Sequence, residues 1–193
     1  MNDFSMVCRV LGTLFYRHPQ DATLAPLLAL IAEGKLMVHW PLEQDDLLQR
    51  LQKSCDLPAL AADYTRLFIN NAADGGPDAA VSPLRSDWVA QGAPEVIPFL
   101  QQLAMPRGDG PADHFGALLL AGSWLEDHAQ LDETAAQRQL FDSYLLPWSQ
   151  GFLGKVEACA NGDFYRTLAI VSREALQALR EELDETPDDV PQS

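Results

Sequence analysis

Residues that hold metals or form disulfides are few in this sequence. Cysteine occurs only at Cys8, Cys55 and Cys159, an odd number without a CxxC pair. The four histidines show no HxxxH spacing, although zinc sites on helices usually need ligands paired on one face. We therefore expect free thiols and no bound metal.

Basic residues are scarce as well. The 193 residues include 13 lysines and arginines against 28 aspartates and glutamates, which gives a formal net charge of −15. Because phosphate binding needs clustered cations, nucleic acid is excluded as a partner. Such a surface either keeps the protein soluble or speeds encounter with cationic partners, and composition leaves both interpretations open.

Targeting segments and catalytic motifs are missing too. The start of the chain carries Asp3 and Arg9 and lacks a signal-peptide cleavage pattern. The uncharged run 143–154 contains Pro147 and is too short to span a bilayer. No GxSxG, GxGxxG or phosphate-loop motif occurs. These absences predict a reduced, cytoplasmic protein that is not an enzyme.

Helical periodicity is the main positive signal. Apolar residues recur with the 3.6-residue period in almost every segment, and Asp56 is expected to cap one of the helices. The expected helices cover about 4–15, 24–31, a segment opening at 41, 56–68, 94–103, 113–125, 134–146, 148–160 and 164–183. The pattern predicts an all-α fold, a single-domain helical bundle of about nine helices over residues 1–183.

Three segments interrupt the helical pattern. Residues 70–83 contain a run of Asp, Gly and Pro and are expected to form a mobile loop. Residues 105–112 alternate glycine and proline and form a hinged connector, while residues 184–193 form a disordered acidic tail. Because loop and connector are plausible hinges, we expect a monomer or a domain-swapped dimer.

The helix expected over 113–125 has an unusual start. Asp113 and His114 precede an almost wholly apolar run. We expect Asp113 to cap the helix and to favour a charged His114 beside it. A second pair, Asp127 and His128, follows about 21 Å further along the same helix and is expected to face solvent.

Aromatic residues stand out in three further motifs. Tyr64 and Phe68 share one helix face, which is the ordinary arrangement of core residues. Trp88 follows the long loop and serves either core packing or recognition. Pro147, in a Leu-Pro-Trp sequence, is expected to end one helix and begin the next.

In order and spacing these motifs resemble the signature of the TorD/DmsD/NarJ family of redox-enzyme maturation chaperones. The similarity extends over about residues 11–169. The motif positions are Asp63, Tyr64, Leu67 and Phe68, then Gly76, Pro77, Pro83, Ser86 and Trp88, then Pro111, Asp113 and His114, and finally Leu146, Pro147 and Trp148. The chain departs from the family pattern at Asp63 and at Leu118, where a glutamate is usual.

The resemblance implies a cytosolic, all-helical chaperone without a cofactor. Such a protein binds a client metalloenzyme, often through a twin-arginine leader, until a molybdenum cofactor or another metal centre is installed. The client-binding residues that it implies are Pro111, Asp113, His114, Trp88, Ser86, Pro83, Tyr64 and Phe68. Leu118 indicates a divergent branch of the family that resembles the YcdY group, and this resemblance implies a cytosolic zinc-dependent hydrolase as the client.

Two other functions stay open at this stage. An acid–base enzyme would use Asp113 and His114, but the sequence offers no third group to complete such a site. A helical adaptor without peptide specificity would need only the fold.

For a chaperone, burying a few leucines of the bound peptide gives about 5–10 kcal/mol of binding free energy. Ordering the peptide costs at least about 2–5 kcal/mol, which leaves roughly micromolar binding.

Overall fold

The computed structural model describes residues 3–69, 76–128 and 133–185. Within these ranges the regular structure is helical and the only β-pairing is one isolated bridge, which confirms the all-α prediction. The α-helices are α1 (Asp3–Tyr16), α2 (Ala25–Ala32), α3 (Lys35–His39), α4 (Asp45–Lys53), α5 (Leu57–Phe68), α6 (Val96–Gln102), α7 (Phe115–Asp127), α8 (Glu133–Gln139), α9 (Leu146–Cys159) and α10 (Asp163–Glu185). The other helical segments are a 3-10 turn (Arg85–Asp87) and a π segment (Leu140–Leu145).

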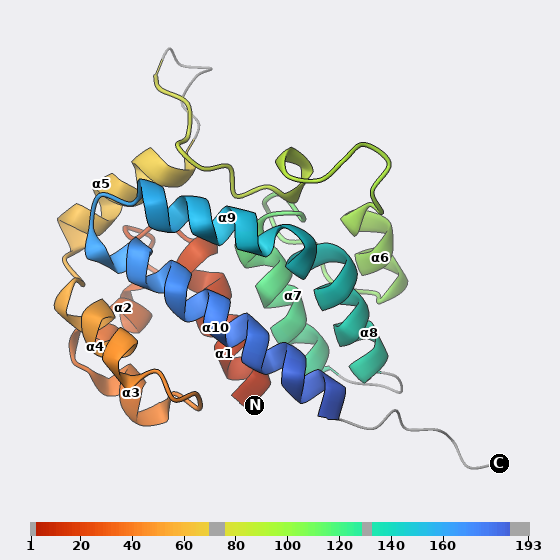
Figure 1. Ribbon diagram of the computed structural model, residues 1–193, viewed down its shortest axis with the longest axis horizontal. Coiled ribbons are helices and arrows are strands. Elements are labelled where there is room, and N and C mark those ends of the chain that lie inside the picture. Colours follow the sequence, from red (N-terminus) through yellow and green to blue (C-terminus); the bar gives the residue numbers. More distant parts are fainter. Residues whose placement is uncertain (1–2, 70–75, 129–132, 186–193) are drawn as a thin grey trace.

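The helices pack in two layers. In Figure 1, α9 and α10 cross the front of the molecule, while α1 and α7 form a pair behind them. Helices α2, α3 and α4 gather at one end, and α6 and α8 lie at the other. The pair α1–α7 approaches closely because Gly12 faces Gly116, and a Cβ atom on Gly12 would lie 2.9 Å from the Gly116 carbonyl.

An aromatic cluster fills the centre of the bundle. Phe115 lies 5.0 Å from Phe15 and 4.7 Å from Phe152, measured between ring centroids. All three rings are buried. Because they come from α7, α1 and α9, their contacts join the two layers, and such aromatic pairs add to the free energy gained by burial.

The chain between α2 and α4 differs from the prediction. Helix α3 was not expected, and the helix expected from Pro41 begins only at Asp45. The cause is the buried amide of Gln44, which accepts a hydrogen bond from Trp40 Nε1 at 2.9 Å and donates to the Val171 carbonyl at 3.1 Å. These bonds hold the preceding residues in a non-helical path against α10.

The prediction that Pro147 begins a helix is confirmed, but no interruption separates that helix from the segment before it. Pro147 lies in the first turn of α9, and the π segment leads directly into that helix. Proline has no N–H to donate to the carbonyl of Ser143, four residues earlier. The Arg85 guanidinium donates to that carbonyl at 3.3 Å, and Trp148 Nε1 donates to the Tyr144 carbonyl at 2.8 Å. Side-chain donors thus satisfy these two carbonyls, and the helical path continues through the proline.

The interrupting segments are only partly described. Residues 70–75 of the expected loop and residues 186–193 of the expected tail lie outside the described residues. Residues 184 and 185 belong to α10, so the prediction that the tail begins at 184 is wrong. The connector 105–112 has no helix, as expected. Over the described ranges, no helix combines the length and the apolar character that crossing a bilayer demands.

Candidate functional site

Two distant segments meet at the start of α7. The Arg85 amide donates to the Asp113 carbonyl at 3.0 Å, and the Phe115 amide donates to the Pro83 carbonyl at 2.8 Å. These bonds form the isolated antiparallel bridge between Leu84 and His114. The structure therefore brings together Pro83, Ser86, Asp113 and His114, four of the residues expected to bind a client.

A cleft of about 470 Å³ opens beside this bridge. The 3-10 turn and the residues after it form one wall, α6 and its approach form another, and the residues before α7 close the end. Its lining includes Ser86, Val89, Glu95, Val96, Ile97 and Asp113. Ile97 is 40% exposed and therefore presents apolar surface to solvent. The cleft thus combines an apolar surface with two carboxylates.

His114, rather than Asp113, caps α7. Its Nδ1 atom accepts a hydrogen bond from the Gly116 amide at 3.0 Å, while the Asp113 carboxylate accepts one from the Ser86 amide at 3.0 Å. The prediction that Asp113 caps the helix is therefore wrong. His114 is the residue directly before the first helical one, and its backbone is extended, as an N-cap requires.

The expectation of a charged His114 is corrected as well. Burial lowers the pKa of His114 to about 4, and the opposing effect of the Asp113 charge is smaller. The imidazole is then neutral at pH 7, and since Nδ1 accepts the capping bond, Nε2 carries the proton. The ring packs edge-on against Tyr16, with 5.1 Å between the centroids.

Trp88 lies beside the cleft but faces α9. Its Nε1 donates to the Ser82 carbonyl at 2.9 Å, and its ring lies 6.4 Å from that of Trp148. The Lys155 ammonium lies 5.8 Å from the Trp88 centroid. Trp88 is half-buried, so both predicted roles, packing and recognition, agree with its position. Pro111 is exposed at the turn that leads into α7.

Tyr64 and Phe68 lie in the core and do not line the cleft. They are 3% and 5% exposed, respectively, and the Tyr64 hydroxyl donates to the Phe15 carbonyl at 2.8 Å. Burial also raises the pKa of Tyr64. The alternative interpretation as an ordinary core stripe describes both residues, and neither can touch a client in this conformation.

The acidic residue of that motif has a role that the sequence analysis missed. Asp63 is buried, and its carboxylate accepts hydrogen bonds from the amides of Asn161 and Gly162, both at 3.2 Å, and from Arg66 at 2.9 Å. Arg66 also donates to the Cys159 carbonyl. Asp63 and Arg66 thus fasten α5 to the turn between α9 and α10. The sequence signal that could have revealed this role is an acidic residue beside the apolar stripe of α5.

Arg85 was missed as well. It is only 5% exposed, and its guanidinium donates to the Pro94 carbonyl at 2.9 Å as well as to that of Ser143. It also lies 5.3 Å from the centroid of Tyr144. The position lines the cleft floor, between the 3-10 turn and the π segment. Only the fold reveals the contacts with Ser143 and Tyr144, because both residues lie far from Arg85 in the sequence.

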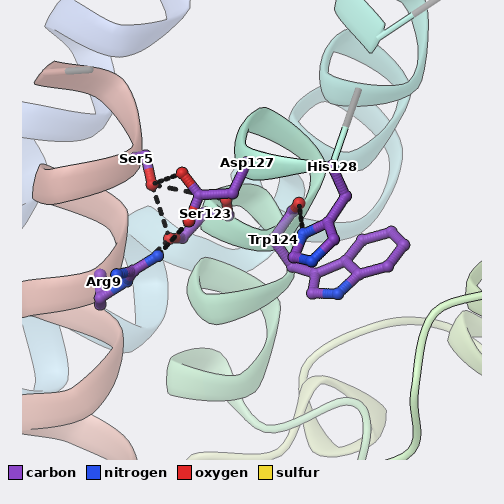
Figure 2. Close-up of polar contacts among 6 residues, drawn as sticks. All are labelled: Ser5, Arg9, Ser123, Trp124, Asp127 and His128. Carbon is purple, nitrogen blue, oxygen red and sulfur yellow. Dashed lines mark hydrogen bonds and ion pairs between the residues drawn. The ribbon is translucent and has the colours of Figure 1, made fainter. Parts of the chain in front are cut away.

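The second Asp–His pair divides between two environments. Figure 2 shows Asp127 pointing to α1, where it accepts a hydrogen bond from Ser5 Oγ at 2.9 Å and pairs with Arg9. Ser5 Oγ also lies 2.9 Å from Ser123 Oγ. The bond from Ser5, together with the Arg9 charge, lowers the pKa of Asp127. Asp127 is exposed, as predicted, but the prediction that it only faces solvent missed these contacts with α1.

His128 does match that prediction. It is exposed on the opposite side of α7, where Figure 2 shows it stacked on Trp124 with 4.5 Å between centroids and 12° between ring planes. One ring nitrogen lies 2.9 Å from the Trp124 carbonyl, so the imidazole covers the end of the helix. A histidine in that position suits the negative end of the helix dipole.

Catalytic and metal-binding arrangements receive no support from these contacts. Asp113 binds the Ser86 amide and His114 binds its own helix, so their side chains are engaged with separate backbone donors. In the described part of the chain, no three His, Cys, Asp or Glu side chains gather as metal ligands would.

The sequence model of the nitrate reductase delta subunit family matches residues 39–154, which is more than half of the chain and includes the bridge and the cleft. The chain belongs to this family. The resemblance inferred from the motifs, to TorD-like chaperones, is thereby confirmed.

Several known relatives align with most of the length of this chain. It is 56% identical to the chaperone protein YcdY of Escherichia coli over 96% of this chain and 98% of that protein. It is 32% identical to the Tat proofreading chaperone DmsD of Salmonella typhi over 89% of this chain and 86% of that one. An uncharacterized protein of Haemophilus influenzae is 37% identical.

Proposed function

We propose that this protein is a cytoplasmic redox-enzyme maturation chaperone that binds a client metalloenzyme, or its leader peptide, in the cleft beside α6 and α7. The observation that carries the proposal is the Leu84–His114 bridge, because it places motif residues from two segments at the edge of one apolar cleft. Bound there, the client would be retained until its cofactor or metal is inserted. The chaperone itself catalyses no reaction.

The chemistry of the cleft favours a cationic, partly apolar segment. Asp113 and Glu95 provide negative charge, and Val89 and Ile97 provide apolar surface. The net charge of −15 adds long-range attraction for a basic partner. A twin-arginine leader, with its arginines and following apolar run, has this composition.

The client itself has two candidates. Identity of 56% with YcdY favours the divergent-branch client, a cytosolic zinc-dependent hydrolase without a leader. The match to a Tat proofreading chaperone favours an exported molybdoenzyme. In either case the protein acts as a monomer or as a domain-swapped dimer.

Affinity purification from native cytosol followed by mass spectrometry separates these clients. The tagged wild type is compared with Asp113→Asn, which keeps an acceptor for the Ser86 amide but removes the charge. Asp46→Asn is the matched control, because Asp46 is exposed on α4 at the other end of the molecule. A metalloenzyme retained by wild type and control but lost with Asp113→Asn supports the proposal. Equal recovery by all three proteins contradicts it.

A further inference from the structure

The α6 wall of the cleft has a small attachment to the bundle. Helix α6 is seven residues long and contributes two buried side chains, Val96 and Phe99. In Figure 1 it lies at the edge of the molecule beside α8, with non-helical chain on both sides. Phe99 stacks on Tyr144 of the π segment, with 4.6 Å between centroids and 21° between planes. The position of α6 therefore depends on this small set of contacts.

Arg85 joins the same elements through one guanidinium group. Nη1 donates to the carbonyl of Pro94, just before α6, and Nη2 donates to that of Ser143 in the π segment. The guanidinium also lies 5.3 Å from the Tyr144 centroid. Arg85 thus connects the approach to α6 with the ring that supports Phe99.

Stability alone does not account for an arginine here. The side chain is buried, no carboxylate pairs with it among the described residues, and its Nε–H group has no acceptor there. Removing such a cation from water costs free energy that two carbonyl acceptors only partly offset. A methionine of similar length would fill the space without that cost. What methionine cannot do is fix Pro94 relative to Ser143.

We infer that Arg85 is a positioning residue that fixes the α6 wall of the client cleft. The inference rests on the proposed function, because it takes this cleft to be the client site. Pro147 supports this arrangement because it has no N–H to donate to the Ser143 carbonyl. That carbonyl therefore accepts the hydrogen bond from Arg85. Arg85 touches the walls of the cleft and sets the distance between them.

Four proteins separate positioning from simple stabilisation: wild type, Arg85→Met, Pro147→Ala, and the double variant. Arg85→Met leaves the Ser143 carbonyl without its side-chain donor, and Pro147→Ala returns an N–H to the segment, so the urea midpoint of the double variant should be at least as high as that of Arg85→Met. Hydrogen exchange in residues 96–102 should nevertheless stay faster than in wild type for both proteins with Met at position 85. If Arg85→Met fails to fold, Arg85→Lys replaces it, because lysine cannot bridge both carbonyls in one plane.

The second readout is anisotropy with a fluorescent synthetic twin-arginine leader peptide. We expect Arg85→Met and the double variant to bind it about tenfold more weakly than wild type, the size of effect of one lost charged hydrogen bond. Pro147→Ala should remain within about twofold. Recovery of binding by the double variant, or unchanged exchange in residues 96–102, would overturn the inference. If wild type itself binds no leader, the leader form of the proposed function fails, and the exchange measurement alone decides the role of Arg85.

Discussion

Replacing His114 with asparagine tests the capping arrangement at the start of α7. The Oδ1 atom of asparagine can take the place of Nδ1 and accept the Gly116 amide, but it does not titrate. In wild type, protonation of Nδ1 would remove the acceptor, and burial lowers the pKa of His114 to about 4. The variant therefore keeps the cap and loses its dependence on pH.

The magnitude follows from the difference between the folded and unfolded states. An unfolded histidine has a pKa near 6.5, so the unfolded chain takes up this proton first as pH falls. The stabilising contribution is complete above about pH 6.5 and is lost as pH falls to about 4. The two pKa values correspond to about 3 kcal/mol of unfolding free energy over this interval.

Urea denaturation at several pH values between 7 and 4 provides the assay. We expect the wild type to lose about 3 kcal/mol more than His114→Asn over this range, while the exposed control His128→Asn follows the wild type. Carboxylates that titrate in the same range affect all three proteins equally, so the difference isolates His114. Parallel curves for wild type and His114→Asn would refute the neutral, capping imidazole.

Further substitutions test the packing and the polar contacts. Asp63→Ala should destabilise the fold by about 2–3 kcal/mol in urea denaturation, because two backbone amides and an arginine lose their buried acceptor. Gly116→Ala should lower the free energy of unfolding by at least about 3 kcal/mol, since its Cβ would lie 2.5 Å from a carbonyl of α1. Gly154→Ala is the control: its Cβ meets no atom within 4 Å, so thermal denaturation should show a neutral or stabilising effect. Ser5→Ala should cost about 1 kcal/mol through its bonds to α7, measured by urea midpoint, and His128→Ala less than about 0.5 kcal/mol.

Long helices were predictable because their signals are local. The period of apolar residues identified α1, α5, α7 and α10, and the expected cap at Asp56 is confirmed by a bond from the Ala59 amide at 3.1 Å. The five-residue α3 and the π segment have no such signal. The path of the chain there depends on two buried side chains with partners far along the sequence. Gln44, after α3, bonds to Val171, and Arg85 bonds to Ser143 in the π segment.

The sequence predicted which motif residues gather at the start of α7 better than it predicted what their side chains do. Motif spacing identified Ser86, Asp113 and His114, and the fold brings them together. The cap could not be assigned from sequence, because the choice between two adjacent residues depends on backbone angles and on a donor, the Ser86 amide, from another segment. Burial of the histidine, which determines its charge, likewise depends on the packed structure. Tyr64 shows the same limit, since a helix stripe does not reveal whether it faces the core or a client.

The most direct test of the account is calorimetric titration of the purified protein with the client recovered from the cytosol. Asp113→Asn should weaken binding by about tenfold or more, because it removes a charge from the cleft while preserving the bond to Ser86. Asp46→Asn, equal in charge change and exposed on α4, should leave the Kd within about twofold. Equal Kd values for all three proteins would show that the client does not bind in the cleft beside α6 and α7.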